Sequence, residues 1–179
     1  MGVVVVFISE VLQNERSEDL NADKLKECIE KHHSTVFRVA YSFVKKREDA
    51  EDIVQEAFFR LYTAEKEFLS DENIKAWLIR VSVNLAKDML KSSHVRNRTE
   101  LTEEIPCGMS REDTLSEMIR RLKGEYCTVL LLFYYEGYTV REIAEIMKTS
   151  QTLVTTRLSR ARKQLKKILL EEGYDEEIY

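Results

Sequence analysis

The stretch that decides the fold runs from Thr139 to Leu169 and reads TVREIAEIMKTSQTLVTTRLSRARKQLKKIL. Thr139 and Glu142 have the spacing of a capping box, in which the Thr hydroxyl accepts from the Glu amide and the Glu carboxylate reaches back. The polar residues 148–150 then predict a turn, and a second helix is expected to begin near Gln151. Two helices joined by a turn of this length are typical of a helix-turn-helix.

The second of these helices is predicted to have two different faces. Its apolar residues recur at alternating spacings of four and three, which gives one buried stripe: Val154, Leu158, Ala161, Leu165 and Ile168. The opposite face is polar and basic, with Thr155, Thr156, Ser159, Arg160, Lys163, Lys166 and Lys167. Such a face fits the major groove of DNA, but a plain helical hairpin with a solvated basic face has the same pattern. Lys148 stands where such turns favour Gly, because φ is often positive there, at a cost of about 1 kcal/mol.

The rest of the chain predicts further helices and two domains. Apolar residues at helical spacing cover 22–44, 48–61, 72–91, 115–122 and 129–135, and the last run, which is apolar on every side, predicts a buried helix. Pro106-Cys107-Gly108 is the clearest breaker. We predict an all-α protein of two small helical domains joined by a flexible linker. Its parts are an N-terminal extension (1–21), a first domain (22–92), the linker (93–112), a second domain (113–172) and an acidic tail (173–179).

Charge is unevenly distributed along the chain, although the net charge is only −4. Residues 48–72 carry nine acidic side chains against two basic ones. Residues 74–98 carry six basic side chains against one Asp, and residues 152–167 carry six basic side chains and no acid. The low net charge therefore conceals two basic segments, and the charge of each is suited to binding nucleic acid.

Two groups of residues raise the question of a metal site. Asp49, Asp52 and Glu56 share one helix side with Phe59, but no second acidic motif faces them, and as a solvated face they need no further explanation. Cys28 is followed by His32 and His33, without a second ligand pair at zinc-like spacing. We therefore predict no metal, no cofactor and no catalytic residue. Cys28 and Cys127 are expected to be core thiols, as in a protein of a reducing compartment.

Four segments, in this order, resemble regions of sigma-70-type RNA polymerase factors. DAEDIVQEAF at 49–58 is similar to region 2.2, and WLIR at 77–80, followed by Asn84, Ala86 and Asp88, is similar to regions 2.3 and 2.4. LLLFYYEGY at 130–138 resembles region 4.1, and 141–162 resembles region 4.2. The match covers about residues 24–169. Two domains with a short linker are similar to the extracytoplasmic-function subgroup.

The sequence departs from the family pattern at three places. Leu122-Lys123 replaces a common Leu-Pro pair, Thr152-Leu153-Val154 replaces Gly-Thr-Val, and Thr155 stands where a basic residue is frequent. The last two departures lie at the start of the predicted recognition helix. They bear on which promoter sequence is preferred and leave the family resemblance unchanged.

The resemblance implies a protein that binds core RNA polymerase, recognises the −35 and −10 promoter elements and promotes DNA melting. Docking on the clamp of the largest polymerase subunit is expected from Asp52, Gln55 and Glu56. Contacts with −10 DNA are expected from Arg80, Asn84, Lys87, Lys91, Arg96 and Arg98, with Asn84 at a base of the opened strand. At −35, base readout is expected from Thr155, Thr156, Ser159 and Arg160, and phosphate contact from Arg157, Arg162 and Lys163.

Several further expectations follow from the residues and the resemblance. The polymerase flap and an anti-sigma factor are expected partners, and the acidic linker residues Glu100, Glu103 and Glu104 are expected near the path of nascent RNA. The apolar run Val3–Ile8 is too short to span a membrane, so we expect a cytoplasmic protein without membrane insertion. Trp77 is expected either in the core or stacked on a base.

Two rival functions are open on sequence grounds. A DNA-binding regulator that works without polymerase would need only the helix-turn-helix. It would leave the segments similar to regions 2.2 and 2.4 without a purpose. A metal-dependent helical enzyme built on the group around Asp49 would need converging ligands, which the sequence does not display.

Overall fold

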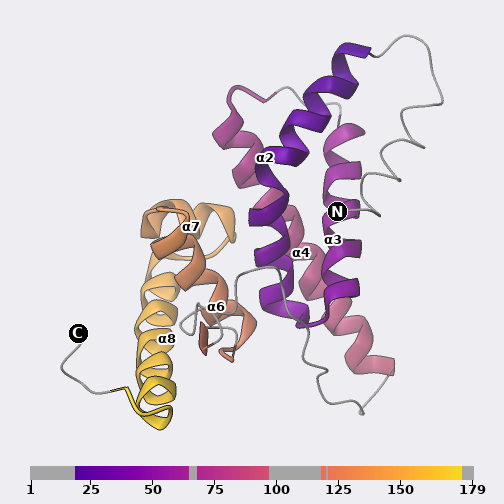
Figure 1. The fold of residues 1–179 in the computed structure, drawn as a ribbon. Helices are drawn as coiled ribbons and strands as arrows, with labels where there is room; N and C mark the ends of the chain where they lie inside the picture. The colour runs from indigo at the N-terminus through magenta and orange to yellow at the C-terminus, as the bar shows by residue number, and fades with distance from the viewer. Residues whose placement is uncertain (1–18, 65–67, 97–117, 120, 175–179) are drawn as a thin grey trace.

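The structure, a computed structural model, describes residues 19–64, 68–96, 118–119 and 121–174 and shows only helices and turns there. The first domain consists of α2 (Asp19–Val44), α3 (Arg47–Tyr62) and α4 (Asp71–Arg96). These three helices pack side by side (Figure 1). The predicted all-α class is confirmed for the described residues.

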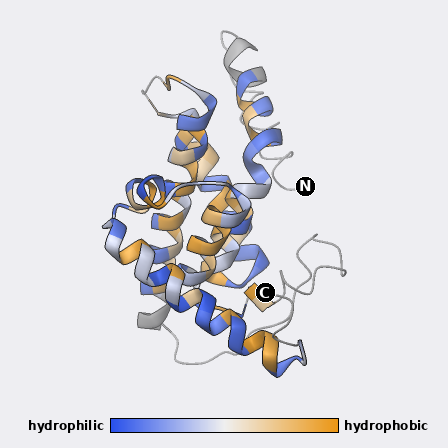
Figure 2. Ribbon diagram, turned by 90° about the vertical axis from the view of Figure 1, so that its left-hand side faces the viewer, coloured by the Kyte–Doolittle hydropathy of each residue, from blue (hydrophilic) through white to orange (hydrophobic). Residues whose placement is uncertain are grey.

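The core of the first domain lies between its three helices, as helical periodicity predicted. Ala50, Val54 and Ala57 of α3 are fully buried, and Leu61 packs at the edge of the core. Hydrophobic residues of the ribbon lie mostly where the helices face one another, and hydrophilic residues lie mostly on the outer turns (Figure 2). Glu48 and Asp49 lie in the first turn of α3, where acidic side chains interact favourably with the helix dipole.

The second domain is built from α6 (Gly124–Leu130), the π-helical turn η1 (Leu131–Tyr135), α7 (Val140–Ile146) and α8 (Gln151–Glu171). The prediction that residues 129–135 form a helix buried on every side was wrong in its second half. Tyr134 and Tyr135 are 63% and 64% exposed, because the wider π-helical turn directs them away from the core. Gly137, at φ 76°, follows the turn as expected.

Two predicted boundaries shift. α2 begins at Asp19, three residues before the predicted start at 22, and α4 continues to Arg96, past the predicted domain end at 92. The sequence Ser92-Ser93-His94-Val95 contains no helix breaker, so the helix runs on into the predicted linker. The N-terminal run Val3–Ile8 and most of the linker, with Arg98 and the acidic residues at 100, 103 and 104, lie outside the described residues.

The two domains pack against each other, which the sequence did not predict. α6 lies against α2, and α7 lies against α4 (Figure 1). The buried hydroxyls of Ser42 in α2 and Thr128 in α6 are 2.7 Å apart. Buried apolar residues of both domains therefore form one connected core.

Candidate nucleic-acid interface

The start of α8 is fixed by several local interactions. Thr139 and Glu142 form the predicted capping box at the start of α7, with the Glu142 amide donating to the Thr139 hydroxyl. Ser150 caps α8 by accepting from the amide of Leu153 at 3.2 Å. Lys148 has φ 49°, the left-handed conformation predicted for this turn. The Thr149 amide donates to the Ala144 carbonyl oxygen at 2.9 Å, so the turn is held to α7 on one side and to α8, through Ser150, on the other.

The outward face of α8 carries most of the predicted readout residues. Val154, Leu158 and Ala161 are buried, so the helix is oriented as its apolar stripe predicted. Thr155, Ser159, Arg160 and Lys163 are exposed, and Thr156 is half-buried. The hydroxyls of both threonines donate to carbonyl oxygens one turn earlier. Each hydroxyl oxygen keeps lone pairs that can accept from a base.

The N-terminal end of α8 exposes residues to which the sequence assigned no role. Gln151 and Thr152 are exposed, and the Leu153 side chain is unusual in being apolar and 40% exposed. Gln can pair with adenine, and an apolar side chain can contact the thymine methyl group. The helical periodicity of the sequence could have identified Leu153 as exposed, because this residue falls outside the apolar stripe of α8.

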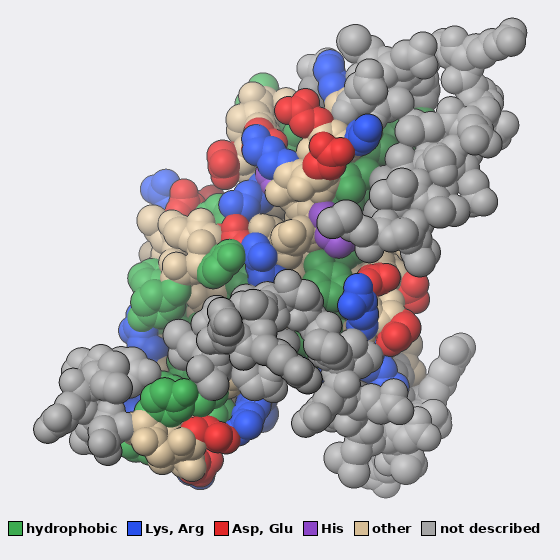
Figure 3. Space-filling model, in the orientation of Figure 1, with side chains coloured by type: hydrophobic (Ala, Val, Ile, Leu, Met, Phe, Trp, Pro, Cys, Tyr) green, Lys and Arg blue, Asp and Glu red, His purple; other side chains and the backbone are tan. Residues whose placement is uncertain are grey.

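Two of the predicted phosphate-contacting residues have partners inside the second domain. Arg157 is only 14% exposed and pairs with Glu125 of α6 at 2.7 Å. The Arg162 guanidinium donates to the Tyr134 hydroxyl at 2.9 Å and lies 5.6 Å from the centre of that ring. The pairing with Glu125 separates Arg157 from the exposed set that includes Arg160 and Lys163, whereas Arg162 stays exposed beside Tyr134. On the face drawn in Figure 3, basic and acidic side chains alternate and do not gather into one patch.

The predicted −10 residues of α4 divide in a similar way. Asn84 and Lys91 are exposed, and Lys91 lies 3.2 Å from Asp88. Lys87 lies 3.8 Å from a carboxylate oxygen of Glu125. The Arg80 guanidinium donates to two backbone carbonyls at the end of α7. Arg96 ends the helix, and its side chain, like the whole of Arg98, lies outside the described residues.

Trp77 lies at the border between the core and a groove. Its ring is half-buried and meets Phe68 edge to face, with 5.6 Å between ring centroids. The groove, of about 540 Å³, lies between the start of α4 and α7, with Ile146 and Arg141 on its second-domain side. Trp77 therefore packs against the core and also lines the groove.

The acidic side of α3 carries the predicted docking residues. Asp52 is exposed, and Gln55 and Glu56 are half-exposed on the same side of the helix. Glu56 pairs with Arg60 at 2.7 Å, one turn later. The three side chains are thus displayed together, with the buried residues of α3 on the opposite side.

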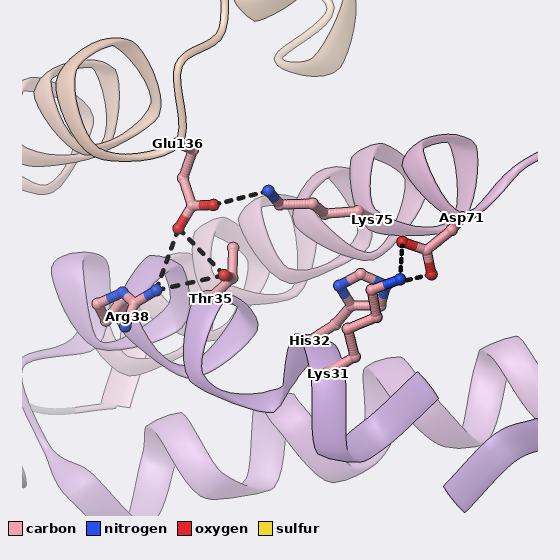
Figure 4. Close-up of polar contacts among 7 residues, drawn as sticks. All are labelled: Lys31, His32, Thr35, Arg38, Asp71, Lys75 and Glu136. Carbon is pink, nitrogen blue, oxygen red and sulfur yellow. Dashed lines mark hydrogen bonds and ion pairs between the residues drawn. The ribbon is translucent and has the colours of Figure 1, made fainter. Parts of the chain in front are cut away.

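The Cys28 and His32 side chains, which the sequence offered as possible metal ligands, have other surroundings in the structure. His32 is buried, and its Nε2 lies 2.8 Å from Asp71, which also pairs with Lys31 (Figure 4). The Lys31 hydrogen bond lowers the pKa of Asp71. Burial raises the pKa of the Cys28 thiol to about 11. In the described ranges, no three His, Cys, Asp or Glu side chains converge as a metal site would require.

Comparison with known proteins identifies the family. The model of sigma-70 region 2 matches residues 28–96, and the model of sigma-70 region 4 matches residues 112–165. The RNA polymerase sigma factor SigV of Bacillus subtilis (strain 168) is 33% identical over 151 residues, which cover 81% of this chain and 90% of SigV. The chain belongs to the extracytoplasmic-function group of the sigma-70 family.

Other relatives of this sigma factor agree. The extracytoplasmic-function sigma factor SigW of Bacillus subtilis (strain 168) is 25% identical over 167 residues, 82% of this chain and 89% of SigW. The sigma factor RpoE of Bartonella quintana, solved with the anti-sigma factor NepR, has the same fold, with a TM-score of 0.68 at 20% identity over 82% of this chain and 97% of RpoE.

Membership of the family settles the choice among the predicted functions. The sigma factor binds core RNA polymerase and promoter DNA, recognises −35 and −10 elements, and initiates transcription without being an enzyme. It acts on DNA inside the cell. The rival interpretations, a regulator independent of polymerase and a metal-dependent enzyme, are thereby replaced. Among the helices that the structure describes, none has the length and apolar character to cross a membrane.

Proposed function

We propose that three separate surfaces of this sigma factor divide the work of initiation. The exposed face of α8 reads the −35 duplex, α4 binds the opened −10 strand, and the acidic side of α3 docks on polymerase. The observation that carries this proposal is the orientation of α8. Its apolar stripe is buried, so its hydroxyl and basic side chains face outward from a helix whose start is capped.

At −35, base edges are contacted from the first three turns of α8. Thr155, Thr156, Ser159 and Arg160 supply the predicted readout, and Gln151 and Leu153 extend it at the helix start. Arg160 is the strongest candidate because its guanidinium can pair with O6 and N7 of guanine, which discriminates by about 1–3 kcal/mol. Lys163 lies one turn further along and contacts phosphate. Arg157 reaches phosphate only if it leaves Glu125, whereas the exposed Arg162 can contact phosphate through its terminal nitrogens while its Nε stays on Tyr134.

At −10, Asn84 presents an exposed amide that can pair with a base of the opened strand. Lys87 and Lys91 lie one and two turns further along α4, where they can neutralise phosphates. Arg80, Arg96 and Arg98 complete the proposed −10 set. Trp77 lines the same groove as Arg80, so stacking on a base is compatible with its packing on Phe68.

The protein partners follow from the remaining surfaces. Asp52, Gln55 and Glu56 dock on the clamp of the largest polymerase subunit, and the second domain contacts the flap. An anti-sigma factor is a further partner, by analogy with RpoE, which was solved with NepR. We place the protein in the cytoplasm, where polymerase and promoter DNA are found.

Reconstituted transcription tests this division of work. Core polymerase, the sigma factor and a promoter library randomised at −35 and −10 are combined, and start sites are sequenced. The expected result is initiation from a defined start that requires both elements. Selection at −35 alone, with no dependence on −10, would contradict the role given to α4.

A further inference from the structure

A carboxylate of the second domain is buried against two helices of the first. The Glu136 side chain is 6% exposed. One of its oxygens accepts from the Thr35 hydroxyl at 3.0 Å and from the Arg38 guanidinium at 3.1 Å, and the other lies 2.8 Å from the Lys75 ammonium (Figure 4). We call these four residues the Glu136 cluster. Its donors come from α2 and α4, and its acceptor comes from the turn after η1, so the cluster joins the two domains.

The electrostatics of the Glu136 cluster favour a charged carboxylate. Burial acts to raise the pKa of Glu136, but hydrogen bonds from Lys75 and Arg38 outweigh it, and the pKa lies below its ordinary value. A buried ion pair adds little net stability compared with apolar packing, whereas removal of one partner leaves an uncompensated charge. The Nε atom of Arg38 and the hydroxyl of Tyr138 are also buried without a hydrogen-bond partner in the described structure. The contact between the domains therefore depends on the correct placement of these polar groups, while the ion pairs add little to the net stability of the closed arrangement.

A second contact between the domains depends on the absence of a side chain. Gly124, the first residue of α6, lies against the end of α2. A Cβ atom at this position would come within 2.9 Å of the Phe43 Cα and 3.0 Å of the Ser42 carbonyl oxygen. Both are backbone atoms, which cannot move aside as a flexible side chain could. Close approach of the domains therefore requires Gly at position 124.

The packed arrangement covers part of the surface proposed for −10 DNA. The Arg80 guanidinium donates to the carbonyl oxygens of Glu145 and Ile146 at 3.2 Å, so the first helix of the helix-turn-helix lies on α4.

Elements centred near −10 and −35 are about 25 base pairs apart, or roughly 85 Å along the duplex. A compact chain of this length has a radius of gyration of only about 16 Å. The 21 residues 97–117 that connect the domains can reach about 75 Å when extended.

We propose that the Glu136 cluster latches a closed form of this sigma factor that cannot occupy both promoter elements, and that the latch opens before initiation. The inference rests on the −10 and −35 surfaces proposed above. It makes Glu136 a positioning residue that acts through the relative placement of the domains. DNA and polymerase then bind the open form in preference to the closed form, and their binding shifts the equilibrium between the two.

Two substitutions test the latch by independent means. Glu136→Gln removes the charge that Arg38 and Lys75 compensate, and Gly124→Ala adds a methyl group against the α2 backbone. Small-angle X-ray scattering of the full chain should show an increase of a few Å in the radius of gyration for both variants. Glu171→Gln is the matched control, because its exposed carboxylate lies 3.6 Å from the Lys167 ammonium one turn earlier on the same helix. Circular dichroism should show unchanged helicity in all three.

A reversible cross-link tests the consequence for initiation. Ser42→Cys with Thr128→Cys places two sulfurs where hydroxyls now lie 2.7 Å apart, so a disulfide locks the closed form. The oxidised double variant should lose at least ten-fold in promoter-dependent initiation, and reduction should restore it. Each single variant under the same oxidation is the control, with peptide mapping to identify any bond to Cys127.

The results of these experiments separate failure of the latch from failure of the proposed promoter-binding surfaces. Unchanged scattering in both Glu136→Gln and Gly124→Ala, or full initiation by the oxidised double variant, would overturn the latch and leave the three proposed surfaces standing. Failure of the wild-type chain to use either promoter element would instead refute those surfaces. If Glu136→Gln alone loses helicity, its scattering reports unfolding, and the latch is then tested by Gly124→Ala and by the cross-link.

Discussion

The Arg157 guanidinium of α8 lies 2.7 Å from the Glu125 carboxylate of α6, although sequence reasoning assigned Arg157 to phosphate. With a side chain that is 14% exposed, Arg157 ties the recognition helix to the helix that precedes the helix-turn-helix. The pair therefore adds a polar contact to the apolar packing that holds α8 against α6. Lys163, six residues later, is exposed and has no such tie among the interactions that the structure describes.

We expect Arg157→Ala and Lys163→Ala to have different effects. Arg157→Ala should lower the stability of the second domain by about 1–2 kcal/mol, because it removes a partly buried charged hydrogen bond. Lys163→Ala should leave stability unchanged and reduce the salt slope of DNA binding by about one unit. Thermal unfolding and binding titrations across salt concentrations measure the two quantities. A full-unit change in salt slope for Arg157→Ala, without loss of stability, would show that the arginine leaves Glu125 for the phosphate.

Arg160→Ala should relax the preference at a single −35 base pair. The guanidinium is exposed on the outward face of α8, and loss of a bidentate pair with guanine costs about 1–3 kcal/mol of discrimination. Competition binding against all single-base −35 variants gives the measurement, with Lys163→Ala as the matched loss of charge. Equal weakening on every variant would assign Arg160 to phosphate and leave readout to its neighbours.

Replacement of Asp52, Gln55 and Glu56 by Ala should abolish co-elution with core polymerase while far-UV circular dichroism stays the same. The three side chains lie on the exposed side of α3, so their removal does not open the core. Glu27→Ala with Glu30→Ala, which removes two exposed acidic groups from α2, controls for net charge. Wild-type affinity in the triple variant would refute the docking surface.

Asn84→Ala should slow open-complex formation on duplex promoters much more than it weakens binding of core polymerase. The amide is exposed on α4 and is expected to hold a base only after the strands separate. Potassium permanganate footprinting follows melting directly. Normal use of both duplex and pre-melted promoters by the variant would remove Asn84 from the −10 site.

The closed form should lose stability in acid because of Glu136. Its folded-state pKa is lowered below 4.5, so its contribution is complete above that value and is lost as pH falls through the folded-state pKa. Scattering curves between pH 6 and pH 3 should show domain opening in the wild type. Glu136→Gln should lack this pH-dependent component, and an identical pH profile for both chains would contradict the assignment.

The sequence by itself determined much of the local structure and which sides of α3 and α8 face the core. The capping box at Thr139, the left-handed Lys148 and the buried stripe through Val154 depend on residues within a few turns of one another, and all were predicted. The family resemblance likewise depends on ordered local motifs. The π-helical turn that exposes Tyr134 was not predicted, because a run of apolar residues does not reveal its helical type.

Tertiary structure alone decided which charged side chains are available to a partner. Arg157 and Arg160 are both basic residues on one helix, but only the first is close enough to Glu125, 32 residues away, to pair with it. Arg80 and Asn84 share α4, yet α7 lies against the first and leaves the second exposed. Glu136 meets Thr35 and Arg38 across about 100 residues of chain. Periodicity orients a side chain relative to its own helix, whereas pairing depends on how separate helices pack, and that arrangement exists only in the folded chain.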